Sequence, residues 1–232
     1  MEIKFVGTGG AFDAQYGNSS AVIRIGNKTV LLDCGSTVFS SLQTAQLLRE
    51  IDYVLITHFH DDHIGSLSTL LFYYYVYLKE KEVIILYPTS EFKTMLINYL
   101  TFSMISPEKY CSFQPITSFP YILPIDTFGL HVPGLVSYAY YFQEANQAIL
   151  YSGDIAHPTF LYNFILEQNL QPDYIFHEIS FFPSSVHSYY REVFPYLEIA
   201  PTFGYHCDPS QNPSDNIIPL VYNSSFLFSQ SL

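Results

Sequence analysis

The chain has 232 residues and carries nine Lys and Arg against 21 Asp and Glu, so its formal net charge is −12. This acidic balance argues against the broad basic surface with which proteins bind extended nucleic acid. Hydrophobic residues make up 49% of the chain. That content argues against disorder and suffices for the core of a single continuous domain over residues 1–232.

The cysteines and the apolar runs indicate in which cellular compartment the protein works. The three cysteines lie far apart and form no CxxC pair, which is typical of free thiols in a reducing environment. The first residues do not have the pattern of a secretory signal, and the longest apolar stretch, residues 67–78, is too short to span a bilayer. We therefore expect a cytoplasmic protein that does not enter a membrane.

Short apolar runs bounded by Gly and Asn predict strands in the first half of the chain, at residues 3–7, 20–25, 29–33, 53–56 and 83–87. Helical patterns cover residues 38–50, 64–78 and 90–104, the last with Ser90 as its N-cap. Residues 106–125 contain four prolines, and we expect them to be irregular.

The second half continues with predicted strands at residues 128–132, 136–143, 148–152, 174–177 and 202–205. Helices are predicted at residues 159–168 and 188–197. The chain shows no internal repeat, charge block or linker. This order of elements predicts an α/β domain in which sheet-plus-helix layers lie on both sides.

Residues 57–65, Thr-His-Phe-His-Asp-Asp-His-Ile-Gly, follow a predicted strand and contain the histidine motif: His58, His60, Asp62 and His63. Imidazole nitrogen and carboxylate oxygen suit zinc, manganese and iron. On an extended loop the first two histidines share one side, while the last two residues could serve a second ion as the chain enters a helix. The motif predicts a metal site; the alternative is a solvated loop with histidines by chance.

Three later residues, His131, Asp154 and His206, lie at or directly after the ends of predicted strands. A scaffold can aim side chains accurately from such positions. Taken singly they are weak candidates, because an isolated histidine is usually an ordinary residue and an Asp after Gly usually caps a turn. The pattern alone leaves their role open.

The histidine motif is similar to the HxHxDH signature of the metallo-β-lactamase fold superfamily. The family's further ligands match His131, Asp154 and His206 in order, and residues 5–11 and 31–35 resemble its first strands. The resemblance runs from residue 2 to about residue 208. It implies an αββα sandwich, with the metal site at one edge between the two sheets. Aligning residues 131–135 with the thioesterase pattern instead would place a ligand on Leu135, which cannot bind metal, so we prefer His131.

Within the superfamily, His177-Glu178 and Val186-His187-Ser188 resemble segments of ribonuclease Z and its relatives. Two branches compete: ribonuclease Z proper, which trims precursor tRNA, and the compact cyclic-nucleotide phosphodiesterases, including the phage anti-Pycsar enzymes that destroy cyclic-nucleotide signals. Residues 88–127 contain two lysines and no glycine, unlike the Gly-rich basic arm that holds tRNA in long-armed ribonuclease Z. The second branch is favoured.

The resemblance then implies a di-metal phosphodiesterase that opens 3′,5′-cyclic nucleotides to 5′-monophosphates with a hydroxide that bridges the metals. The first ion would take His58, His60 and His131, and the second Asp62, His63 and His206, with Asp154 bridging. We expect zinc, with manganese as the alternative.

The resemblance also assigns roles beyond the ligands. His187 would be the general acid, oriented by Glu178, and Asp62 would also hold the attacking water. Asp33 would steady a ligand histidine. Each of these residues could instead have a purely structural place. His187 could simply neighbour a helix cap, Glu178 could be a surface carboxylate, and Asp33 could be a turn residue.

Other functions and contacts stay open. The runner-up function is a ribonuclease Z-like tRNA 3′ endonuclease, and the third is a protein that binds metal or sequesters a signal without turnover. The aromatic run at residues 72–77 suits either core packing or the contact of a homodimer. Residues 209–232 match nothing in the family, and their apolar run at 217–222 would pack on the domain or on a partner.

Overall fold

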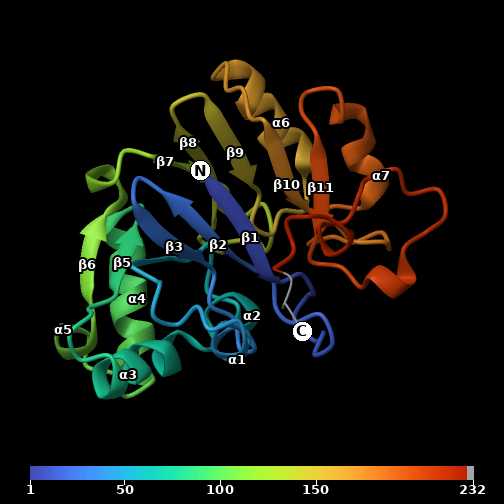
Figure 1. Cartoon of the computed structure of the whole chain (residues 1–232). Coiled ribbons are helices and arrows are strands. Elements are labelled where there is room, and N and C mark those ends of the chain that lie inside the picture. The colour runs from blue at the N-terminus through green and yellow to red at the C-terminus, as the bar shows by residue number, and fades with distance from the viewer. Residues whose placement is uncertain (229–232) are drawn as a thin grey trace.

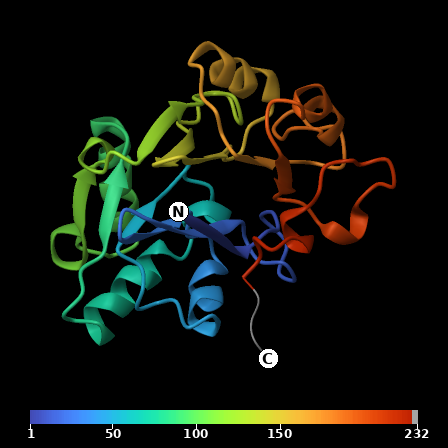
Figure 2. The ribbon, with the colours of Figure 1, turned by 45° about the horizontal axis from the view of Figure 1, so that its top comes forward.

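The structure, a computed structural model, describes residues 1–228. Two sheets face each other and helices cover the outer face of each (Figures 1 and 2). Helices α1 to α4 lie outside the first sheet, whereas α6 and α7 lie on the side of the second. This arrangement confirms the αββα sandwich expected from the sequence.

The first sheet is six-stranded and its strands follow the chain order: β1 (Glu2–Gly7), β2 (Ser20–Ile25), β3 (Lys28–Leu32), β4 (Tyr53–Leu55), β5 (Ile84–Tyr87) and β6 (Ser112–Pro115). Strands β1 to β3 pair antiparallel, and β3 to β6 pair parallel. The parallel strands end at one edge of the sheet, from which their following loops emerge.

The second sheet is five-stranded, in the order β11 (Thr202–Tyr205), β10 (Tyr174–Glu178), β9 (Gln147–Tyr151), β8 (Tyr138–Glu144) and β7 (Ile122–Asp126). Strands β9, β10 and β11 run parallel, and β8 is antiparallel to both neighbours. The carboxyl ends of β7, β9, β10 and β11 therefore share one edge, as those of β3 to β5 do in the first sheet.

The α-helices are α1 (Val38–Thr44), α2 (Asp61–Ile64), α3 (Leu67–Tyr77), α4 (Ser90–Phe102), α5 (Pro107–Tyr110), α6 (Pro158–Glu167) and α7 (Tyr190–Val193). Short 3₁₀ turns lie at Ile116–Ser118, Phe194–Tyr196, Pro209–Gln211 and Val221–Asn223. None of the helices described for residues 1–228 combines the length and hydrophobicity that crossing a bilayer requires.

The core between the sheets is built on aromatic rings. Phe5 of β1 is fully buried, and its ring lies 5.2 Å from Phe176 and 5.6 Å from Tyr205 of the opposite sheet. Tyr140 of β8 donates a 2.8 Å hydrogen bond to the carbonyl of Ile56, which lies two residues before the first histidine of the motif. Apolar burial and these polar contacts together set the position of the loop after β4 relative to the second sheet.

Two sequence predictions about strands are wrong. Residues 128–132 form turns, because Gly129 and Gly134 adopt left-handed φ angles of 70° and 79° on either side of Pro133. Residues 106–125 contain α5, β6 and the start of β7 rather than irregular chain. Prolines are tolerated there because β6 and β7 are the edge strands of their sheets, where a missing N–H leaves no ladder bond unmade.

Several helix boundaries also differ from prediction. The helix expected at 64–78 corresponds to α3, which begins only at Leu67 and is preceded by the separate short helix α2. The helix expected at 38–50 ends at Thr44, and that at 188–197 is reduced to α7 and a 3₁₀ turn. The N-cap of α4 is Thr89 rather than Ser90, because the Thr89 hydroxyl accepts the Phe92 N–H at 3.2 Å.

The apolar run at 217–222 packs on the domain, since Ile218, Leu220 and Val221 are buried and Leu220 pairs with Gly204 of β11. Residues 229–232 of the unmatched C-terminal segment lie outside the described part of the chain.

Candidate metal centre

The candidate ligands gather where the carboxyl ends of the parallel strands of both sheets meet. The loop after β4 carries the histidine motif, and its last two residues lie in the first turn of α2. Asp154 follows β9, His206 follows β11, and His131 lies in the turns between β7 and β8. Segments more than 140 positions apart in the chain thus supply one cluster.

Three histidines form the first group. His60 Nδ1 lies 3.0 Å from His58 Nε2 and 3.1 Å from His131 Nε2, and one nitrogen from each ring falls within 4.8 Å of the others. The His131 Nδ1 faces the carbonyl of Val186, which leaves Nε2 toward the group. Burial lowers the pKa of His58 well below its ordinary value, and burial with the adjacent His131 lowers that of His60. Both rings therefore stay neutral, the form that binds a metal ion.

The second group is Asp62, His63, Asp154 and His206. His206 Nε2 lies 3.1 Å from Asp62 Oδ2 and 3.5 Å from Asp154 Oδ2, and His63 Nε2 lies 3.4 Å from the same two oxygens. Burial alone would raise the pKa of Asp154, but the adjacent His206 and His63 hold it well below its usual range. The carboxylate is consequently ionised.

Unsatisfied atoms show that these residues fit a divalent cation. Within residues 1–228, His63 Nε2 and Asp154 Oδ1 are buried and have no hydrogen-bond partner. Buried polar atoms without a partner are rare and costly, and these two belong to residues of a group whose imidazole nitrogens and carboxylate oxygens lie within 4.8 Å of one another. That donor set is typical of zinc, with manganese and iron as further possibilities.

A buried carboxylate supports the second group from behind. Asp33 Oδ2 accepts from His63 Nδ1 at 2.8 Å, and Asp33 Oδ1 accepts from the Thr57 N–H at 2.7 Å. Proton donation from Nδ1 leaves the Nε2 lone pair of His63 facing Asp62 and Asp154. The expected contact between Asp33 and a ligand histidine is thus present in the structure.

The backbone around the group leaves little room for other side chains. A Cβ on Gly35 would fall 1.8 Å from the carbonyl oxygen of Asp62, so only glycine allows α2 to approach so closely. His206 itself adopts a φ of 64°, which costs a non-glycine residue free energy, and its N–H is held by the Thr8 carbonyl at 2.8 Å. Such strain is common at functional sites.

Glu178 and His187 form a pair beside the ligands. Glu178 is fully buried, and its Oε1 accepts from the backbone N–H groups of Ile155 and Ser188 at 3.0 and 3.1 Å. His187 Nδ1 lies 3.4 Å from Glu178 Oε2 and 3.7 Å from Asp154 Oδ2. Burial lowers the pKa of His187, but these carboxylates outweigh it and raise the pKa to about 9.

Comparison with known proteins decides the family. The sequence model of the family described as Anti-Pycsar protein Apyc1 matches residues 1–202. The chain belongs to this family. The Anti-Pycsar protein Apyc1 of Bacillus phage BSP38 is 28% identical over 219 residues, which cover 84% of this chain and 83% of that protein.

Solved structures show the same fold. The metallo-β-lactamase fold protein YhfI from Bacillus subtilis superposes with a TM-score of 0.73 at 21% identity and covers 92% of this chain and 88% of its own. Human tRNase Z, short form, reaches a TM-score of 0.66 at 18% identity, with 91% of this chain and 95% of that one covered. The metallo-β-lactamase fold expected from the sequence is confirmed.

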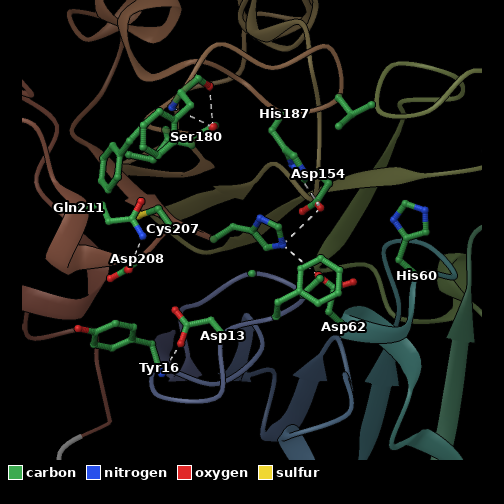
Figure 3. Close-up of a pocket in the computed structure, with 18 of the residues that line it drawn as sticks. Asp13, Tyr16, His60, Asp62, Asp154, Ser180, His187, Cys207, Asp208 and Gln211 are labelled. Atoms are coloured by element: carbon green, nitrogen blue, oxygen red, sulfur yellow. Dashed lines mark hydrogen bonds and ion pairs between the residues drawn. The ribbon is translucent and has the colours of Figure 1, made fainter.

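A cavity of about 660 Å³ opens over both ligand groups of this anti-Pycsar family member, within the usual range of ligand sites (Figure 3). Beside candidate ligands and His187, its wall is formed by residues 10–16, 132, 179–182, 186, 207, 208 and 211. Sequence reasoning did not find these wall residues. In the sequence, only the turn at Gly9-Gly10 after the first strand could have indicated this wall. The aromatic and polar residues of the wall do not form a spacing pattern that predicts a site.

Proposed function

We propose that this chain is a metal-dependent phosphodiesterase that hydrolyses 3′,5′-cyclic nucleotides to 5′-monophosphates. The observation that carries the proposal is the His187–Glu178 pair beside the two ligand groups, because hydrolysis of a phosphodiester needs a proton donor for the leaving oxygen as well as an electrophilic centre. Membership in the anti-Pycsar family supports cyclic nucleotides as the substrate class and evasion of anti-phage defence as the setting.

The ligand assignment follows the two groups. His58, His60 and His131 would hold one ion, Asp62, His63 and His206 a second, and Asp154 would contact both. We propose zinc, with manganese as the alternative. When bound, such ions activate water at neutral pH and neutralise phosphate charge.

The chain's own residues then position the substrate and move protons. Because His187 Nδ1 faces Glu178, its Nε2 is the nitrogen available to a ligand in the cavity. A proton on Nε2 can pass to the leaving 3′ oxygen, while the buried Glu178 carboxylate on the Nδ1 side stabilises the charged form of the ring. Asp62, which also lines the cavity, would accept a hydrogen bond from the attacking water.

The charge of the site argues for a small substrate. No Lys or Arg is among the described residues that line the cavity, and the whole chain carries a net charge of −12. Extended RNA needs many cationic contacts to its phosphates, whereas one cyclic phosphate can be neutralised by bound cations and His187. We therefore do not expect the chain to cleave precursor tRNA as ribonuclease Z does.

The test incubates purified protein and zinc or manganese with four 3′,5′-cyclic nucleotides and, separately, with a precursor tRNA. We expect 5′-monophosphates and intact tRNA; cleavage of tRNA alone, or nucleotide binding without product, overturns the proposal. His60→Ala should lose metal and activity together. His187→Ala should keep its metal content and lose about 10²–10⁴-fold in rate. His157→Ala, at an exposed histidine outside the cavity, is the matched control.

Three further expectations stay predictions. The single domain over residues 1–232 and the cytoplasmic location are untested by the structure. The homodimer is supported by Phe72, Tyr75 and Tyr77, whose side chains on α3 are exposed while Tyr74 between them is buried. Sedimentation of the wild type, which should give the mass of two chains, tests this proposal; a mass of one chain contradicts it.

A further inference from the structure

Residues 181–187, which we call the His187 loop, carry the proposed proton donor on a segment without regular secondary structure. Backbone hydrogen bonds close the loop at its base. The Ser180 N–H donates to the Ser188 carbonyl at 2.7 Å, and the Tyr190 N–H donates to the Ser180 carbonyl at 3.0 Å. The two ends of the loop are therefore fixed, and contacts inside it must hold the conformation between them.

The Ser184 hydroxyl holds the second half of this loop. Its Oγ accepts from the backbone N–H of Val186 at 3.2 Å and from that of His187 at 3.1 Å. Within residues 1–228 neither N–H has another hydrogen-bond partner. One side-chain oxygen thus fixes two consecutive peptide units.

The peptide unit between Val186 and His187 is held from both sides. Its N–H belongs to His187 and donates to Ser184 Oγ, and its carbonyl belongs to Val186 and accepts from His131 Nδ1. In a planar trans peptide the N–H and the C=O point in opposite directions. The hydroxyl of Ser184 therefore determines the direction in which the Val186 carbonyl meets His131.

This peptide unit serves both parts of the proposed site. A carbonyl can only accept, so His131 carries its proton on Nδ1 and keeps the Nε2 lone pair for the first ligand group. The ring of His187 starts from the same peptide, with Nδ1 at 3.4 Å from Glu178 Oε2. Figure 3 shows this ring directed toward Asp154. A rotation of the peptide would move the carbonyl and the imidazole together.

Resting on the function proposed above, we infer that Ser184 is a positioning residue, whose hydroxyl orients the Val186–His187 peptide and through it both the ligand His131 and the proton donor. It acts without touching the substrate, since it is not among the described residues that line the cavity. The second ligand group, which Asp33 supports, does not depend on this peptide.

Ser184→Ala removes the acceptor. The affinity for one of two ions should fall about tenfold, the lower end of the effect of changing a residue behind a ligand, and the affinity for the other should stay. At saturating metal, kcat should fall about tenfold or more because the proton donor is misplaced, and KM should change by less than about twofold. A merely stabilising role would lower the melting temperature without separating the two ions or kcat from KM.

Two further variants make the inference sharp. Ser184→Asp keeps an acceptor at this place and should restore both values. Asp13 of this chain shows that such a carboxylate fits, because its Oδ1 accepts from the N–H groups two and three residues on, each at 2.9 Å. Ser185→Ala, at the exposed neighbouring serine, is the matched control and should equal the wild type.

The experiment titrates chelator-treated protein with zinc or manganese by calorimetry and measures kcat and KM on 3′,5′-cyclic nucleotides. Unchanged affinities, an equal loss for both ions, wild-type kcat, or a loss that Ser184→Asp does not restore overturn the inference while leaving the phosphodiesterase intact. If no cyclic nucleotide is hydrolysed, the phosphodiesterase proposal fails and the titration decides: selective weakening of one ion supports the inference, and equal or absent binding overturns it. Should Ser184→Ala not fold, Ser184→Cys takes its place, because a thiol is close in size but accepts poorly.

Discussion

Replacing Asp33 by Asn tests how the second ligand group is supported. The carboxylate accepts from the Thr57 N–H through Oδ1 and from His63 Nδ1 through Oδ2. Asn is nearly the same size, and its oxygen must remain with the Thr57 N–H, which can only donate. Its NH₂ then faces His63 Nδ1, so that nitrogen must accept and the ring proton moves to Nε2. The nitrogen that faces Asp62 and Asp154 would no longer offer a lone pair to a metal.

We expect Asp33→Asn to weaken metal binding by about 10–100-fold, the usual effect of changing such a supporting residue. That corresponds to about 1.4–2.8 kcal/mol of binding free energy. Calorimetric titration of chelator-treated protein with zinc or manganese measures it. Asp52→Asn is the control, because Asp52 accepts the Thr29 N–H at 2.9 Å from a position outside the cavity. Wild-type stoichiometry and affinity in Asp33→Asn would refute the tautomer argument.

Three further changes have expected outcomes. Removing metal with a chelator should lower the melting temperature, because an ion present at about 100 times its Kd stabilises the folded state by about 2.7 kcal/mol; an unchanged melting curve would contradict metal binding. Gly35→Ala should destabilise the protein by about 1–3 kcal/mol and reduce metal content, since its Cβ meets the Asp62 carbonyl; denaturant melts and metal analysis check both. Phe5→Ala should cost about 3–5 kcal/mol, because the ring packs between the two sheets; a loss below 1 kcal/mol in denaturant melts would contradict that packing.

Much of the fold followed from local patterns. The runs at 20–25 and 202–205 match β2 and β11 at both ends, because each is apolar and bounded by turn residues. The errors at 106–125 and 128–132 arose where tertiary context outweighs composition. Prolines at 115 and 124 lie in edge strands that the sequence does not mark as edges, and two glycines with left-handed φ turned an apolar run into a loop.

The site was predictable in part. The histidine motif is visible from spacing alone, whereas His131, Asp154 and His206 depended on the resemblance and were placed together only by the structure. The cavity wall could not be predicted. Its lining residues come from segments far apart in the chain, among them residues 10–16 and 179–182, and no periodicity reports such an arrangement.

The proposed activity requires a metal centre at the joined edge of the two sheets. Anomalous diffraction from crystals grown with zinc or manganese tests this most directly. We expect one peak among His58, His60 and His131, and a second among Asp62, His63, Asp154 and His206. Crystals of catalytically active protein without anomalous signal at these side chains, or with metal bound only elsewhere, would contradict the account.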